Sequence, residues 1–337
     1  MHKNNFDFLR ILFAIMVVFT HCYAITGMGE VDALYFLTGG QLVFSFIGLS
    51  GFFTLSGYLI LKSLFRSTSI FEYLKKRVLR IYPALVILMI VTFIIGAIVS
   101  AIGIVGYLKI SSPYTYVISQ LSLFGSFQTT IDTVFCNGTV NASLWTIAYE
   151  FSFYILLILL FFIINYPKAI RVILIIIFVV LFVTYKHFLS FASFWFIPGT
   201  VLNRFFLVYY GLFFCAGCIL ATIDLRRLKH VNFIILGCIL LAIISIKVHH
   251  FNLSKVLLLP PVFILFGLKN TPLLSRMSNK IGDLSYGIYI YGFLVQQTVL
   301  NYFPMNYWQL FIAVMPILLI IAFTSWHLVE KRALAYK

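Results

Sequence analysis

The chain has 337 residues, of which 62% are hydrophobic and only 10% are charged, and its mean hydropathy is +1.06. This composition excludes a soluble globular domain, because charged residues make up about a quarter of such domains. The formal net charge of +15 comes mostly from basic loops on one side of a membrane, so it does not indicate a nucleic-acid partner.

Apolar segments long enough to span a bilayer recur along the whole sequence. A transmembrane helix needs about 20 predominantly apolar residues. We therefore expect an all-α, multi-pass integral membrane protein that is embedded in the lipid bilayer. A single transmembrane domain would cover residues 1–337. The ten predicted helices cover residues 8–26, 42–62, 82–105, 143–165, 169–187, 205–223, 231–248, 255–269, 284–301 and 309–328.

The segment 106–142 lies between the third and fourth predicted helices. It includes the partly apolar stretch YTYVISQLSLFGSF, but Pro113, Gly125 and Gly138 interrupt it. We expect an extracytoplasmic loop that dips into the membrane rather than an eleventh helix. The sequence leaves open whether this loop contains an extra membrane-embedded segment.

Lys and Arg residues are distributed unevenly between the two sides of this ten-helix arrangement. One side carries 19 of the 24 Lys and Arg residues and the other side carries 5. Cytoplasmic loops of membrane proteins hold an excess of basic residues. The asymmetry therefore predicts that both termini are cytoplasmic.

Arg10 and His21 stand eleven positions apart in the first predicted helix. Eleven steps of about 100° come within about 20° of three full turns, so the two side chains share one face, about 16 Å apart along the axis. Ionisable groups inside a membrane are costly and usually mark a functional path. The simpler alternative is an Arg that reaches the membrane surface and a hydrogen-bonded core His.

A basic stretch, EYLKKRVLRIYPAL at residues 72–85, joins the second and third predicted helices. In a helix, Lys76 and Arg77 would both lie close to Arg80, which follows them by four and three positions. Guanidinium groups grip phosphate bidentately, so the cluster suits a phosphorylated cytoplasmic ligand. The alternative is that these basic residues only set the orientation of the helices in the membrane and are attracted to anionic lipid.

An acidic residue, Glu150, follows Trp145 by five positions in the stretch NASLWTIAYEFSFYILL. A carboxylate near the outer end of the fourth helix could orient a buried imidazole and stabilise its protonated form. The alternative is a solvated acid at a helix start, which the helix dipole favours.

The five cysteines do not indicate a metal site. Cys215 and Cys218 have CxxC spacing, but they lie within an apolar helix. Small polarizable core residues are the simpler interpretation there. We therefore expect no bound metal.

Six motifs in order along the chain resemble those of the acyltransferase-3 family, integral-membrane enzymes that acylate sugars and other acceptors outside the cytoplasm. R-X10-H alone is a weak pattern, but six ordered matches on a ten-helix frame are specific. The motifs are D-x-x-R with R-X10-H (Asp7, Arg10, His21), LSGFFTLSGYLI (49–60), KKRVLRIYP (75–83), SLWTIAYE (143–150), LSYGIYIYGF (284–293) and VEKRAL (329–334).

The resemblance implies an O-acetyltransferase of the bacterial inner membrane that has no bound cofactor. Acetyl-CoA or another acyl-CoA would be the co-substrate. The acceptor would be a hydroxyl of an extracytoplasmic cell-envelope glycan, either O-antigen, lipopolysaccharide, capsule or exopolysaccharide. His21 would serve as general base or become transiently acylated. The residues expected at the site are His21 and Glu150 for catalysis, Arg10, Arg77 and Arg80 for the acyl donor, and Asp7, Ser56, Trp145 and Tyr286 in support.

Two positions depart from the family pattern. Gly292 stands where many members have a His in the late motif, and Ala333 stands where the closing motif has a Pro. The chain also ends shortly after its tenth predicted helix. We therefore expect no fused extracytoplasmic hydrolase-like domain of the kind that some relatives carry.

The main alternative is a transporter that moves a lipid-linked sugar or an anion without covalent chemistry. Ten helices with Arg10 and His21 would suit a proton-coupled carrier. Internal repeats are typical of many carriers, and the sequence has none that we detect. A glycan polymerase or ligase is a third alternative.

Overall fold

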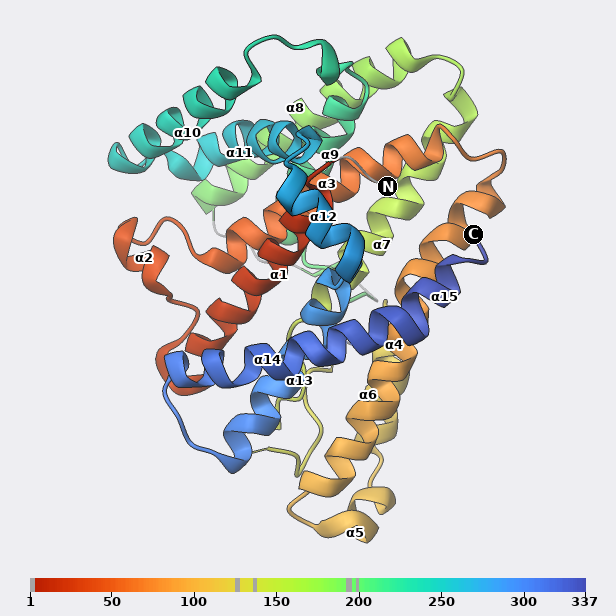
Figure 1. Ribbon diagram of the computed structural model, residues 1–337, viewed down its shortest axis with the longest axis vertical. Coiled ribbons are helices and arrows are strands. Elements are labelled where there is room, and N and C mark those ends of the chain that lie inside the picture. Colours follow the sequence, from red (N-terminus) through yellow and green to blue (C-terminus); the bar gives the residue numbers. More distant parts are fainter. Residues whose placement is uncertain (1–3, 125–127, 136–137, 192–195, 198–199) are drawn as a thin grey trace.

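A computed structural model describes residues 4–124, 128–135, 138–191, 196–197 and 200–337. Within these ranges the chain is helical, with only two isolated β-bridges (Figure 1). The helices are α1 (Phe6–Tyr23), η1 (Ala24–Met28), α2 (Ala33–Leu37), α3 (Phe44–Leu64), α4 (Ile70–Val99), α5 (Gly103–Lys109), α6 (Ser112–Ser122), α7 (Trp145–Leu157), η2 (Ile158–Ile163), α8 (Pro167–Phe191), α9 (Arg204–Ala221), η3 (Leu225–Arg227), α10 (Val231–Lys247), α11 (Phe251–Leu268), α12 (Pro272–Ile281), α13 (Ser285–Tyr302), α14 (Tyr307–Ser325), η4 (Trp326–Glu330) and α15 (Lys331–Leu334).

Every one of the ten predicted membrane segments contains a helix. In the described part of the chain, eight helices are long and apolar enough to cross a membrane. The other two predicted spans correspond to α10, which has 17 residues, and α13, which carries several polar side chains. The all-α membrane fold is thus confirmed.

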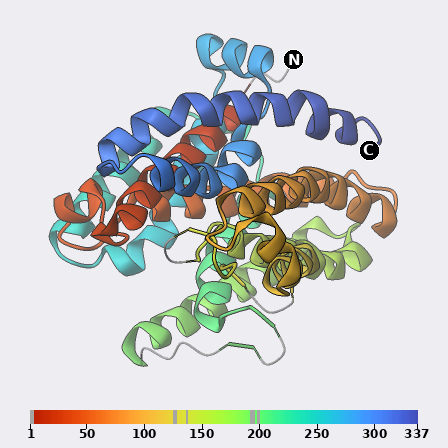
Figure 2. The ribbon, with the colours of Figure 1, turned by 90° about the horizontal axis from the view of Figure 1, so that it is seen from below.

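Helix α13 is one of the most buried helices of the bundle. Twelve of its 18 residues are buried, and it packs against α1, α4 and α14. In α8, by contrast, only 11% of the residues in an apolar 18-residue stretch are buried. Figure 2 shows α14 and α8 on opposite sides of the molecule, with α1 and α13 close to α14. The polar α13 therefore lies in the protein interior, whereas α8 presents apolar side chains to lipid, as expected for a helix at the rim of a membrane bundle.

Helix α4 begins twelve residues before the predicted span 82–105. Ser69 caps it by accepting a hydrogen bond from the backbone N–H of Glu72 at 3.1 Å, and Pro83 lies within the helix. The basic stretch is therefore helical and not a loop. Hydropathy missed this start because the first turns of α4 are charged, although Ser and Glu at these positions are typical of a helix N-terminus.

The segment 106–142 is more ordered than the predicted loop. It contains most of α5 and all of α6, which pack against α4, and a β-bridge joins Thr130 to Thr139. With 7 and 11 residues, neither helix is long enough to span a bilayer. Residues 125–127 and 136–137 lie outside the described ranges.

Helices α3 and α9 approach each other at two glycines. A Cβ atom added to Gly57 would overlap the carbonyl oxygen of Phe214, and one added to Gly217 would overlap that of Thr54. Small residues permit this close packing of membrane helices, whose association depends on van der Waals contact. The glycines thus set the distance between the two helices, and Ser56 on α3 is positioned with them.

Replacing Gly57 with alanine should lower the thermal stability of the purified protein. The new methyl group must push α3 away from α9, and overpacking of this kind typically costs about 1–3 kcal/mol. The melting temperature in detergent measures the effect. Gly237→Ala on α10 is the control, because a Cβ there meets nothing within 4 Å; equal melting temperatures for the two variants would contradict the prediction.

Candidate active site

A cavity of about 490 Å³ opens between α1, α3, α4, α7, α13 and the C-terminal segment. Seven of the nine predicted site residues line it, namely Asp7, Arg10, Ser56, Arg77, Arg80, Glu150 and Tyr286. The lining contains six Lys or Arg residues but only three Asp or Glu residues. Its net positive charge suits an anionic ligand.

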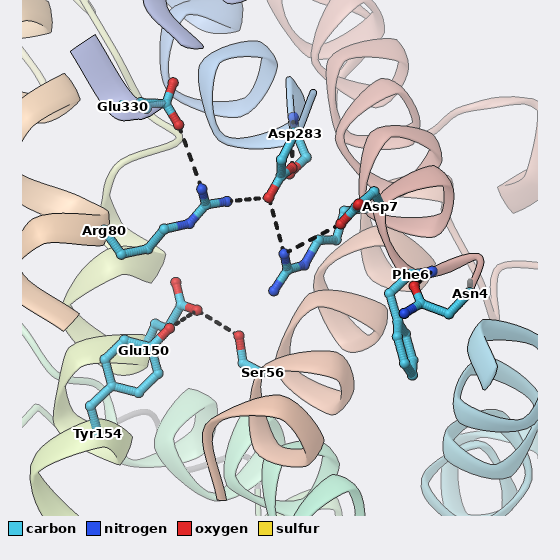
Figure 3. A network of polar contacts seen from close by, with 11 residues as sticks. Asn4, Phe6, Asp7, Ser56, Arg80, Glu150, Tyr154, Asp283 and Glu330 are labelled. Carbon is cyan, nitrogen blue, oxygen red and sulfur yellow. Dashed lines mark hydrogen bonds and ion pairs between the residues drawn. The ribbon is translucent and has the colours of Figure 1, made fainter. Parts of the chain in front are cut away.

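An ion-pair network crosses one wall of the cavity (Figure 3). Asp283 lies in the short connection before α13. Its Oδ2 accepts hydrogen bonds from both Arg10 Nη1 at 3.0 Å and Arg80 Nη2 at 2.6 Å. Arg80 also lies 3.7 Å from Glu330 through Nη1. Asp7 is 4.0 Å from Arg10. The network therefore connects α1, α4, α13 and η4 through charges that are mostly withdrawn from solvent.

The charges of the two arginines determine the ionisation of Asp283. Burial by itself would raise the pKa of this carboxyl. The nearby charges of Arg80 and Arg10 outweigh burial, and hydrogen bonds from Ser285 add to them, so the pKa of Asp283 is held below its usual range. Asp283 is therefore the counter-ion of both arginines.

Arg77 differs from Arg80 because it forms no ion pair with a carboxylate among the described residues. It is 7% exposed, and Nη2 donates to Ser63 Oγ at 3.2 Å. Its buried Nε has no hydrogen-bond partner, and none of the described carboxylates lies within ion-pair distance of its guanidinium. The rings of Tyr73 and Tyr154 lie 5.8 and 5.7 Å from Cζ. A buried cation in this condition is costly unless a ligand compensates it.

Glu150 binds two hydroxyl groups in the middle of the cavity wall. Its Oε1 accepts a hydrogen bond from Ser56 at 2.6 Å and another from Tyr154 (Figure 3). The structure does not bring Glu150 and His21 together: Glu150 accepts from Ser56 and Tyr154, whereas His21 meets Ser143. Glu150 lies seven residues, or about two helical turns, beyond Ser143, which is the residue that meets His21.

His21 lies beyond the inner end of the cavity and is not part of its lining. It is 9% exposed and its ring meets that of Phe293 edge to face at 5.3 Å. Thr146 and Tyr289, whose hydroxyl oxygens are 2.5 Å apart, are cavity-lining residues. Tyr289 also donates to the carbonyl of Ser143 at 2.7 Å, and Ser143 meets His21, so these contacts link the cavity lining to the imidazole.

Arg10 and His21 share one face of α1, as their spacing predicts, and the structure turns this face towards α13. Arg10 contacts Asp283 just before α13, and His21 contacts Phe293 within it. At the neighbouring position 292, an added Cβ would lie 2.9 Å from Val18 Cγ2. A larger residue such as the His that many family members have there would require Val18 to move, which gives a physical reason for Gly292.

The remaining predicted residues have different surroundings. Tyr286 lines the cavity, donates to the carbonyl of Ile81 at 2.9 Å, and lies under the guanidinium of Arg80. Trp145 instead packs among aromatic rings of α7 and α9, away from the cavity. Tyr286 thus ties α13 to α4, while Trp145 belongs to the core.

Sequence reasoning missed Asp283, Ser143 and Tyr289 as site residues. Asp283 directly precedes the LSYGIYIYGF motif and is one of only nine acidic residues. A search for the counter-ions of Arg10 and Arg80 among these few acids would have included it. Ser143 and Tyr289 lie within motifs that were already recognised, but their contacts depend on the packing of α7 against α13.

Comparisons with known proteins agree with the motifs. The chain is 29% identical to an O-acetyl transferase of Shigella phage Sf6 over 99% of this chain and 97% of that protein. It is 32% identical to nodulation protein 10 of Rhizobium leguminosarum bv. viciae over 46% of this chain and 43% of that protein. No solved structure matches. The acyltransferase-3 family model, described as an acyltransferase domain, matches residues 3–327; the chain therefore belongs to this family and is an integral-membrane acyltransferase.

Proposed function

We propose that this enzyme moves an acetyl group from cytoplasmic acetyl-CoA to a hydroxyl of a cell-envelope glycan on the opposite side of the bacterial inner membrane. The observation that carries the proposal is Arg77, a buried guanidinium without a carboxylate partner on the wall of a cation-rich cavity. The O-acetyl transferase of Shigella phage Sf6, to which the whole chain is similar, supports acetyl as the group transferred.

The cavity lining suits the two ends of an acyl-CoA. Phosphates would lie near Arg77 and the lysines at the mouth, Lys280, Lys331 and Lys337. The pantetheine arm would run along Phe52 and Ile147 towards Thr146 and Tyr289. Because Arg10 and His21 are about 16 Å apart along α1, an extended arm can cover the distance between the basic mouth and the imidazole.

His21 supplies the acid–base chemistry in this proposal. The acceptor oxygen attacks the thioester carbonyl carbon while its proton passes to the imidazole; the C–S bond then breaks, and the thiolate takes up the proton. Alternatively, Nε2 of the imidazole attacks the thioester carbonyl carbon first, and the C–S bond breaks to release the CoA thiolate. The acceptor hydroxyl then attacks the acyl-imidazole, the acyl–nitrogen bond breaks, and the hydroxyl proton passes to the thiolate. Glu150 does not contact His21, so its role in either route would be to hold Ser56 and Tyr154 at the cavity wall.

Replacing Arg77 with alanine should raise the acetyl-CoA KM about tenfold or more. A charge-assisted hydrogen bond to phosphate is worth about 1.5–3 kcal/mol, and 1.4 kcal/mol corresponds to a factor of ten. The acceptor KM should barely change, because the acceptor enters from the other side. Arg77→Lys should recover part of the donor affinity, since an ammonium group lacks the planar fork.

Proteoliposomes supplied with radiolabelled acetyl-CoA and envelope glycan measure both KM values. Arg227→Ala is the matched control, because Arg227 is 87% exposed and pairs only with Asp224 in the described structure. A rise in acceptor KM with an unchanged donor KM would overturn the two-sided model. Intact acetyl-CoA and unlabelled glycan after incubation with the wild-type protein would overturn the proposed reaction itself.

A further inference from the structure

A hydroxyl group, and not a carboxylate, meets the imidazole of His21. Ser143 Oγ lies 3.4 Å from His21 Nδ1, and both residues are buried. Across the described residues, no Asp or Glu forms an ion pair with His21. The orientation of the ring therefore depends on a neutral partner, which is cheaper to bury in a membrane than an ionised one.

Hydrogen bonds hold the backbone of Ser143 at both its N–H and its carbonyl group. Its N–H donates to Asn141 Oδ1 at 3.0 Å, and its carbonyl accepts a hydrogen bond from Tyr289 OH at 2.7 Å. Asn141 is fully buried, and its Nδ2 donates to the carbonyl of Ile290 at 2.8 Å. Two residues of α13 thus anchor the segment before α7, and this rigid support holds the Ser143 hydroxyl against His21 on α1.

We propose that Ser143 is a positioning residue for His21. Its hydroxyl accepts the Nδ1–H of the imidazole, which leaves the Nε2 lone pair free to take a proton or an acyl group. The hydrogen bond made by one ring nitrogen determines which tautomer is present. This inference rests on the role given to His21 in the proposed function.

The same hydrogen bond serves both protonation states of the ring. When Nε2 takes the proton of the acceptor, Nδ1–H still donates to Ser143 Oγ, so the ring does not need to rotate during the reaction. Glu150 cannot take this role, because it is bound to Ser56 and Tyr154. The sequence expectation of an acid–imidazole pair is thus replaced by a serine–imidazole pair.

Ser143→Ala in the full-length protein should lower kcat by about tenfold to a hundredfold, since small misplacements of reacting groups have effects of this size. The acetyl-CoA KM should stay within about twofold, because Ser143 does not line the donor cavity. Ser143→Thr, which retains a hydroxyl, should recover most of kcat. Ser152→Ala is the matched control, because the described structure gives that hydroxyl only the Ala148 carbonyl of its own helix; its kcat should be unchanged.

Asn141→Ala provides a second variant that leaves the Ser143 hydroxyl in place. It removes the support of the Ser143 backbone, so kcat should fall with little change in the acetyl-CoA KM. Wild-type kcat for Ser143→Ala, together with an inactive His21→Ala, would overturn the positioning role and leave the proposed function intact. Equal losses of kcat and melting temperature for Ser143→Ala and Ser143→Thr would also overturn it, since the hydroxyl would then not matter. An active His21→Ala would instead overturn the proposed function.

Discussion

His21→Ala should abolish acetyl transfer while leaving acetyl-CoA binding close to that of the wild type. A positioned general base typically contributes about 10²–10⁴-fold to the rate. His327 also lines the cavity, but its Nδ1 contacts the carbonyl of Phe323 on its own helical segment at 3.0 Å. Donor binding should survive because His21 lies outside the cavity lining. Initial rates of label transfer in proteoliposomes and equilibrium binding of radiolabelled acetyl-CoA measure the two properties separately.

His250→Ala is the control for this experiment, because His250 is exposed at the start of α11 and should not affect either measurement. A well-folded His21→Ala protein that retained substantial activity would remove the imidazole from the mechanism. Incubation of the wild-type enzyme with labelled donor alone adds a further distinction. Label that stays on the protein indicates an acyl-imidazole, whereas unlabelled protein indicates a general base.

Asp283→Asn should destabilise the protein by about 3 kcal/mol, which is the lower end of the range for breaking a buried ion pair. The carboxylate compensates Arg10 and Arg80 together, at 3.0 and 2.6 Å. An uncharged amide would leave both guanidinium groups poorly compensated. The lower end applies because the arginine side chains are 22% and 18% exposed, so water in the cavity partly solvates them. The melting temperature in detergent and the yield of folded protein measure the loss.

Asp224→Asn is the matched control for Asp283→Asn. Asp224 pairs with Arg227, but the two side chains are 57% and 87% exposed, and exposed ion pairs contribute little to stability. This variant should melt close to the wild type. If Asp283→Asn were equally stable, the network that joins α1, α4 and α13 would not contribute to the fold.

The sequence by itself determined the class of the protein and the position of most of its helices. Hydropathy is a local property, so spans such as 169–187 could be located without knowledge of their neighbours. Helical geometry is local as well, which is why the spacing of Arg10 and His21 correctly placed both on one face; only the structure shows that this face meets α13. The ordered motifs identified the family, since each is a short contiguous pattern. They also included many of the residues that line the cavity, from Asp7 to Tyr286.

Only the tertiary structure decided which of these residues meet. Glu150 and Ser56 are 94 positions apart, and Arg80 and Asp283 are 203 positions apart. Their pairing depends on the rotation and depth of each helix in the bundle, which glycines such as Gly57 set through close packing. A sequence gives the face of each helix but not its height relative to the others. For this reason it could propose Glu150 as the partner of His21, whereas hydrogen bonds with α13 hold the segment before α7 so that Ser143 meets His21 instead.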